Sequence, residues 1–225
     1  LMWIIHFFSD GKFYSIFSML FGVGFALQMQ RSIDKGEAFV GRYTRRLLIL
    51  FIFGLLHGFL FFVGDILSMY ALTGFLLLLF RKQSNKYLLI AVILLLCLPV
   101  IQYAIFWWQG QGLPPADSSG DQAFFQELVI VYRSGSFSDI VFNNIGGTLF
   151  GRYPDLIFTG RFFKVLAMFL LGFYIAKTKL FAFTQVRKSI YKKILLWMAV
   201  IGIPCNLVLA QLMTTDAYYN LEPAG

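Results

Sequence analysis

Two long apolar runs separated by a very short break constrain this chain more than any other feature. The stretch from Arg45 to Arg81 reads RRLLILFIFGLLHGFLFFVGDILSMYALTGFLLLLFR, with arginines at both ends and Gly64-Asp65 at the break. About 20 consecutive apolar residues suffice for a helix to cross the hydrocarbon core of a bilayer. The stretch therefore predicts a transmembrane helical hairpin.

The composition extends this prediction to the whole chain. Of its 225 residues, 59% are hydrophobic and only 13% are charged, whereas a soluble domain carries about 25% charged residues. Backbone groups in lipid must be paired internally, so the spanning elements are helices or a closed barrel. Because the apolar runs are long and continuous rather than alternating in segments of about 10 residues, we predict an all-α, polytopic transmembrane helical bundle.

Hydropathy predicts six spanning helices in a single integral-membrane domain. The predicted spans cover residues 13–30, 47–63, 66–80, 87–108, 157–176 and 194–213. The fifth span has two possible starts, Pro154 and Arg161. Between the fourth and fifth spans, residues 109–153 form a loop in which Phe124 to Tyr132 have helical spacing, typical of an amphipathic helix on the membrane surface.

The distribution of positive charge predicts the orientation. Loops 31–46, 81–86 and 177–193 hold most of the 19 Lys and Arg residues, and cytoplasmic loops carry such an excess. The Gly64-Asp65 turn and the loop 109–153 are then extracytoplasmic. The net charge of +8 is thus explained by the basic cytoplasmic loops of a membrane protein. We expect the lipid bilayer as partner and no binding of nucleic acid. Because the chain starts at Leu1 and both of its ends lie between predicted spans, we expect a fragment of a longer membrane protein.

His57 is the first candidate for chemistry. It lies six residues before the outer end of the second span, roughly 9 Å deep at about 1.5 Å per residue. Ionisable residues at such depth usually face a bundle interior and are candidates for function. Gly54 and Gly58 flank it and form a small-residue face that another helix can approach. Two interpretations stay open: a neutral imidazole that bonds a neighbouring helix, or a catalytic group.

Three further residues are associated with this site. Asp65 is expected to cap the third span and, as a catalytic candidate, to orient His57. The two lie roughly 12 Å apart on a straight helix, so a direct bond requires the turn to fold back. Tyr70, one helical turn further on, is a candidate substrate-binding residue. His6, in the incoming outer loop, is a second candidate catalytic histidine.

Two pairs of cations are candidate substrate-binding residues. Arg161 and Lys164 share a helix face at spacing i, i+3 and either anchor to headgroups or form an outer anion-binding pocket. Arg45 and Arg46 either snorkel to cytoplasmic phosphates or bind a nucleotide-like substrate. No metal site is expected, because the two histidines lie far apart in the sequence. The chain contains no P-loop, Rossmann, H-E-x-x-H or G-x-S-x-G motif.

Four segments of the chain carry a resemblance to a known family. FSMLFGVGFALQMQR, YTRRLLILFIFGLLHGFLFFVGDILSMYALTG, VLAMFLLGFYIAKTKLF and KKILLWMAVIGIPCNL resemble the YeiB-like family of bacterial inner-membrane proteins, a domain of unknown function. The resemblance implies a multi-pass protein of the bacterial inner or plasma membrane.

The YeiB-like family is in turn distantly similar to transmembrane acyltransferases. Those enzymes move an acyl group from a cytoplasmic donor to an acceptor across the membrane, using a histidine on the outer side. The resemblance implies an acyl-CoA donor, a histidine base (His57 or His6) and donor phosphates near Arg45 and Arg46. The alternative is a transporter or exporter of a small molecule, with His57, Asp65, Arg161 and Lys164 along its path. A non-catalytic membrane scaffold is the third possibility.

Overall fold

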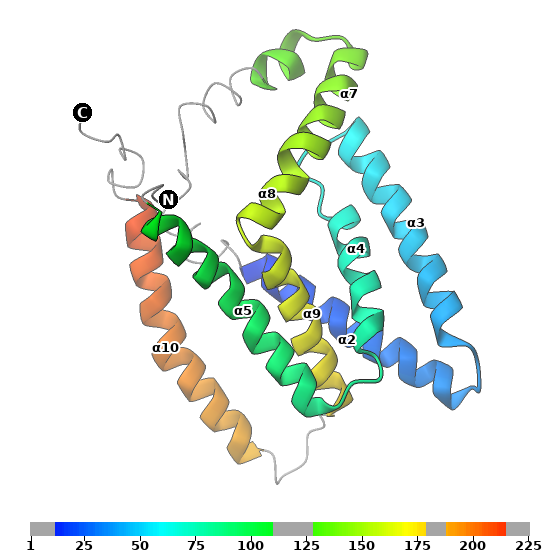
Figure 1. Cartoon of the computed structure of the whole chain (residues 1–225), viewed down its shortest axis with the longest axis vertical. Helices are drawn as coiled ribbons and strands as arrows, with labels where there is room; N and C mark the ends of the chain where they lie inside the picture. Colours follow the sequence, from blue (N-terminus) through cyan, green and yellow to red (C-terminus); the bar gives the residue numbers. More distant parts are fainter. Residues whose placement is uncertain (1–11, 110–127, 179–187, 215–225) are drawn as a thin grey trace. The chain divides into compact units, whose positions relative to one another are not determined.

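The computed structural model describes residues 12–109, 128–178 and 188–214 of the chain (Figure 1). The described residues are helical apart from short connections, and no strand occurs among them, so the all-α prediction is confirmed. Residues 128–134 are helical. The other elements are α2 (Lys12–Asp34), α3 (Phe39–Leu60), α4 (Leu67–Leu77), η1 (Leu78–Phe80), α5 (Asn85–Trp108), α7 (Phe137–Gly146), the π-helix η2 (Gly147–Arg152), α8 (Tyr153–Phe158), α9 (Arg161–Lys177) and α10 (Lys188–Thr214).

Three described helices are long and apolar enough to cross a membrane: α2, α3 and the Asn85–Ile105 part of α5. A fourth candidate arises if Phe137–Phe158 and Arg161–Lys177, which meet at a bend of 67°, form one broken span. Only about a fifth of the residues in each of the three long helices is buried, although the helices are apolar. These properties are compatible with a membrane protein.

The prediction of six spans exceeds what the described residues contain. Leu67–Phe80 and, within α10, Ala199–Val208 are apolar but shorter than a span. The predicted span 157–176 runs across Gly160, whose positive φ of 68° ends α8 and starts α9. Glycine adopts this left-handed conformation at little cost, so a helix can end there. A hydropathy window averages over the residues on both sides and does not detect the break.

The predicted loop 31–46 is mostly helix. α2 continues to Asp34 and α3 begins at Phe39, because Arg and Lys favour a helix almost as strongly as Leu does. Only a tight turn remains. In it, Gly36 N–H donates to the Ile33 carbonyl (3.0 Å) and Glu37 N–H to the Ser32 carbonyl (2.9 Å). This is a Schellman motif, which requires the left-handed φ of 66° that Gly36 adopts.

The predicted loop 109–153 contains a well-formed helix. Ser136 caps α7 because its hydroxyl accepts the Asp139 N–H, while the Asp139 carboxylate accepts the Ser136 N–H. This capping box is a sequence signal that the hydropathy analysis missed. The predicted amphipathic helix begins outside the described residues, and its end falls within the helical residues 128–134.

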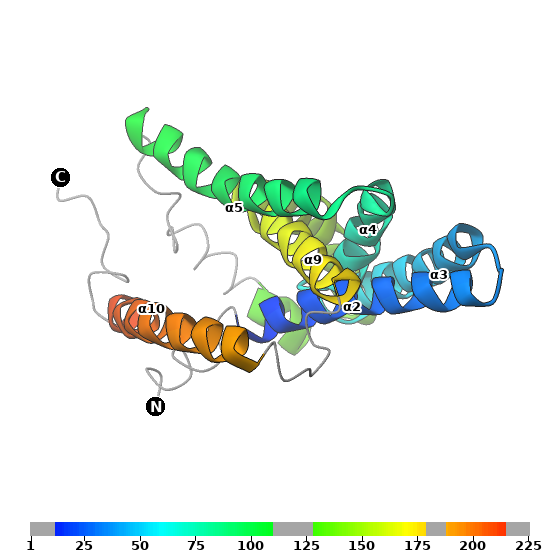
Figure 2. The same ribbon diagram turned by 90° about the horizontal axis from the view of Figure 1, so that it is seen from below.

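The chain divides into two compact units. One comprises Phe17–Thr178, and the other comprises Leu1–Ile16 together with Lys179–Gly225, of which the structure describes residues 12–16 and α10. Within the larger unit, α3 packs on α4 and α7, and α9 packs on α4, α5 and α8. The neighbouring pairs α3/α4 and α5/α9 can be followed in Figure 1 and Figure 2.

An aromatic core joins α2, α4 and α9 within the larger unit. The rings of Phe21 and Phe169 stack at 4.6 Å, and Tyr70 meets Phe169 edge-on at 5.2 Å. Phe25 meets Phe173 edge-on at 5.0 Å. These offset and edge-to-face arrangements are those that aromatic rings prefer, so the core fixes the three helices in register.

Glycine allows α2 and α9 to touch through their backbones. A Cβ placed on Gly22 would lie 1.9 Å from the Phe169 carbonyl oxygen, and one on Gly172 would lie 1.9 Å from the Met19 carbonyl oxygen. In lipid, helix association depends on such close packing because the solvent is as apolar as the side chains. The reciprocal contact therefore fixes α2 against α9.

Candidate functional site

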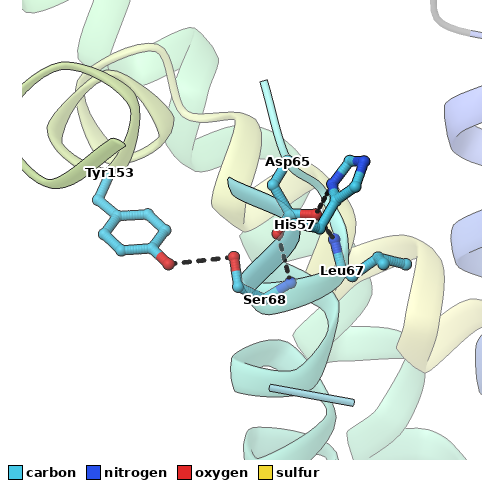
Figure 3. Close-up of polar contacts among 5 residues, drawn as sticks. All are labelled: His57, Asp65, Leu67, Ser68 and Tyr153. Carbon is cyan, nitrogen blue, oxygen red and sulfur yellow. Dashed lines mark hydrogen bonds and ion pairs between the residues drawn. The ribbon is translucent and has the colours of Figure 1, made fainter. Parts of the chain in front are cut away.

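His57 and Asp65 bond directly at the end of α3. The His57 Nδ1 atom lies 3.0 Å from Asp65 Oδ1 (Figure 3). The chain turns back immediately after the helix, because the N–H groups of Phe61 and Phe62 both donate to the His57 carbonyl at 3.0 Å. This turn removes the separation that a straight helix would impose.

Asp65 also caps α4, as the sequence predicts. Its Oδ1 accepts the Leu67 N–H at 3.2 Å and its Oδ2 accepts the Ser68 N–H at 2.8 Å. A buried carboxylate is costly unless hydrogen bonds compensate it, and here three donors do so. Because an ionised carboxylate only accepts hydrogen bonds, the proton between His57 and Asp65 belongs to Nδ1 when Asp65 is ionised, and Nε2 then has a free lone pair.

The two side chains differ sharply in exposure. The Asp65 side chain is 1% exposed, whereas the His57 side chain is 44% exposed. Figure 3 shows the second ring nitrogen of His57 directed away from Asp65, and no hydrogen bond joins it to any residue that the structure describes. One side of the imidazole is thus held in place and the other is open to a reactant.

Two glycines allow α3 to come close enough for this contact. A Cβ on Gly54 would lie 2.3 Å from the Ser68 backbone nitrogen, and one on Gly58 would lie 3.3 Å from the Asp65 Cβ. The GLLHG segment therefore presents the small-residue face that its spacing predicts, and the start of α4 packs on it. His57 lies beside this face and reaches Asp65 because of it.

Helices η2 and α8 add polar groups that the sequence analysis missed. Tyr153 donates its hydroxyl hydrogen to Ser68 Oγ at 3.0 Å, which links α8 to the capped end of α4 (Figure 3). The buried Thr148 hydroxyl of η2 would lie 3.6 Å from a Cβ on Gly58, and it has no hydrogen-bond partner among the described residues. Single-turn π-helices often occur at functional sites, but their sequences carry no simple signal.

Tyr70 lies in the aromatic core rather than in the polar group around His57. Its hydroxyl is 2.8 Å from Ser18 Oγ, and the side chain is buried between Phe17, Phe21 and Phe169. The structure thus explains Tyr70 as a packing residue with a satisfied hydroxyl.

Arg161 and Lys164 are both exposed at the start of α9. Of the two predicted starts, α9 begins at Arg161, while Pro154 lies in the first turn of α8. Arg161 pairs with Asp155 at 3.4 Å, across the Gly160 break. The structure does not bring either cation to His57, and His6 falls outside the described residues.

Arg45 and Arg46 both lie on α3, and they differ in surroundings. Both are exposed, but Arg46 donates to the Gln28 side-chain oxygen at 2.7 Å and lines a cavity between α2 and α3, whereas Arg45 does not line that cavity. The two arginines are neighbours in the sequence, but consecutive residues point to different sides of a helix, so only Arg46 lines the cavity.

The chain is similar to two proteins of Bacillus. It is 38% identical over 212 residues to the uncharacterized protein YxaH of Bacillus subtilis (strain 168), a match that covers 89% of this chain and 51% of YxaH. It is 44% identical over 103 residues to an uncharacterized 39.9 kDa protein in the amylase 3′ region of Bacillus acidopullulyticus, covering 45% of this chain and 30% of that protein. The chain thus spans about half the length of YxaH. No family model and no solved structure matches it.

Proposed function

We propose that this chain is part of a transmembrane acyltransferase, related to the YeiB-like family, that acylates an extracytoplasmic acceptor. The observation that carries the proposal is the bond between His57 Nδ1 and the buried Asp65 carboxylate, with Nε2 left open. A base that is oriented by a third group and open on its reactive side is the arrangement that activates hydroxyl and amine nucleophiles.

In the proposed step, His57 Nε2 accepts the proton of the acceptor hydroxyl or amine as its oxygen or nitrogen attacks the acyl carbonyl carbon. The bond from that carbon to the donor's leaving group, a thiolate for acyl-CoA, then breaks. The imidazolium returns the proton to the leaving group. Asp65 is a positioning residue, because it holds the ring and stabilises its charged form without touching the reactant.

The proposed membrane arrangement has six spans in the bacterial inner or plasma membrane. Most Lys and Arg residues lie in the three predicted cytoplasmic loops, which supports this orientation. His57 and Asp65 then lie at the extracytoplasmic end of α3, and Arg46 lies toward the cytoplasmic end. This polarity suits an enzyme whose donor and acceptor occupy opposite sides.

The test uses the full-length protein in nanodiscs with radiolabelled acetyl-CoA and measures binding and turnover. General-base catalysis contributes about 10²–10⁴-fold, so His57→Gln is expected to lower kcat by that factor. Asp65→Asn retains only one of the two side-chain oxygens that accept the Leu67 and Ser68 N–H groups, so it is expected to lower kcat substantially and to lower the unfolding temperature as well. Lys82→Gln, an exposed cation outside the site, serves as the control. Wild-type activity in His57→Gln, or no turnover by the wild type, would overturn the proposal.

A transporter is the second candidate, because of the bent helix pair. Phe137–Phe158 includes the π-helix η2 and meets Arg161–Lys177 at 67°, and broken helices build the substrate sites of many transporters. Flux of a small molecule into proteoliposomes, without covalent change and sensitive to His57→Gln, would favour this function over acyl transfer.

A further inference from the structure

A cavity of about 140 Å³ lies between the end of α2 and the start of α3, away from His57. Four cationic side chains line it: Arg31, Lys35, Arg42 and Arg46. No acidic side chain lines it among the described residues. The cavity therefore concentrates positive charge.

The helix register explains this concentration. Arg31 and Lys35 are four positions apart on α2, or at its end, and Arg42 and Arg46 are four positions apart on α3. Residues at i, i+4 share a helix face, and like charges in this arrangement repel each other. The Schellman turn at Gly36 reverses the chain, so that both basic faces border one cavity. The pairs Arg31/Lys35 and Arg42/Arg46 border the same cavity. A bound anion would reduce the repulsion between their charges, which indicates an anion-binding site.

The described acidic residues neutralise only part of this charge. Glu37 pairs with Arg42 at 2.6 Å, and among the described residues Arg46 bonds the neutral side chain of Gln28 alone. Neither Arg31 nor Lys35 forms an ion pair with any residue that the structure describes. The cavity thus keeps a net positive charge.

The Tyr43 hydroxyl is a second, independent indication of a ligand. Tyr43 lines the cavity and is 3% exposed, yet its buried hydroxyl has no hydrogen-bond partner within the described ranges. Its ring is fixed by Phe39, stacked at 5.2 Å, and by Phe25, edge-on at 4.9 Å. A buried unpaired hydroxyl is costly, and an oxygen acceptor in the cavity would satisfy it.

We propose that this cavity binds a phosphate group carried by an anionic ligand. Arginine forks match phosphate oxygens in paired hydrogen bonds, and the Tyr43 hydroxyl would donate one more. The phosphate belongs either to an anionic phospholipid headgroup or to a soluble phosphate ester such as coenzyme A. The proposal does not depend on acyl transfer, and it assigns Arg46, but not Arg45, to the site.

The binding experiment uses the full-length protein in phosphatidylcholine nanodiscs, titrated with inorganic pyrophosphate and, separately, with coenzyme A. Retention of phosphatidylglycerol over phosphatidylcholine is measured on the same protein by native mass spectrometry. Arg31→Gln/Arg42→Gln is expected to weaken binding at least tenfold, and Tyr43→Phe severalfold. Arg45→Gln removes one positive charge outside the cavity, against two in the double variant, and is expected to bind like the wild type.

The arms of the experiment separate the two sources of phosphate. Saturable binding of pyrophosphate and coenzyme A indicates a soluble ester, whereas selective retention of phosphatidylglycerol that pyrophosphate does not displace indicates a lipid headgroup. No binding of any probe would overturn the proposal. Size-exclusion chromatography checks that both variants are folded. An equal loss of affinity in Arg45→Gln and in the cavity variant would also overturn the proposal, because the binding would then depend on general surface charge.

Discussion

The two ends of α3 differ in how their buried polar groups are hydrogen-bonded. At the His57 end, the buried Asp65 carboxylate accepts three hydrogen bonds, and glycines bring α4 against it. At the Arg46 end, the buried Tyr43 hydroxyl has no partner in the described part of the chain, and cations surround a cavity. One end of α3 is therefore preorganised by hydrogen bonds within the protein, while the other end has polar groups placed to bind a ligand atom.

Distance keeps these two ends independent. Arg46 and His57 lie roughly 16 Å apart along the helix, at about 1.5 Å per residue. Changes at sites more than about 10 Å apart with no shared partner usually have additive effects. Each end can therefore be altered without disturbing the other.

The largest effect is expected from Asp65→Ala. The change leaves two backbone N–H groups and the His57 ring without their acceptor, and each buried unpaired group costs about 1–3 kcal/mol. We expect the free energy of unfolding, measured by denaturant titration in micelles, to fall by about 3 kcal/mol. Asp34→Ala, which removes an exposed carboxylate on α2, is the control. Equal stability of the two variants would mean that the cap does not organise the His57 end.

A smaller loss is expected when the approach of α4 is blocked. In Gly54→Ala the new Cβ would meet the Ser68 backbone nitrogen at 2.3 Å, whereas in Gly41→Ala, on the same helix, it meets nothing within 4 Å. Overpacking costs about 1–3 kcal/mol, so the unfolding temperature should fall in Gly54→Ala alone. A matched fall in both variants would indicate a general requirement for glycine in α3 rather than a specific contact.

The smallest change in stability is expected when either of two buried tyrosine hydroxyls, those of Tyr70 and Tyr43, is removed. Tyr70→Phe removes a hydroxyl bonded to Ser18 and is expected to cost about 1 kcal/mol. Tyr43→Phe removes an unpartnered hydroxyl, so stability without ligand should stay equal or rise. Thermal unfolding of both variants without phosphate checks this difference. A larger loss for Tyr43→Phe would show that its hydroxyl is already satisfied in the free protein.

The helices were predictable from sequence because apolar runs are long and continuous, but their ends were not. The helical start of α3 lies among arginines that hydropathy treats as loop, since charged residues continue a helix without making it apolar. The span predicted across Gly160 shows the reverse problem, because one glycine ends a helix without lowering the average hydropathy. Both differences arise from backbone conformation, which composition does not record.

The candidate site was predictable only in part, because local sequence shows the types of its residues but not the contacts between distant segments. The sequence distinguishes His57 and Asp65 as ionisable groups in apolar surroundings, and the Asp65 cap follows from local chemistry. Their direct bond depends on the turn after Leu60, and the contribution of Thr148 and Tyr153 depends on helices packed from far along the chain. No local pattern encodes such contacts. The cavity cations were visible in the sequence, but only the Gly36 turn brings their two faces to one place.

The glycine contact between α2 and α9 has a consequence for biosynthesis. Gly22 emerges from the ribosome well before the partner backbone at Phe169 and Gly172. During that interval the small-residue groove of α2 stays without its native neighbour. Folding of the larger unit is therefore completed late, and a bulky residue at Gly22 should reveal itself as an incompletely assembled chain cleared by membrane proteases.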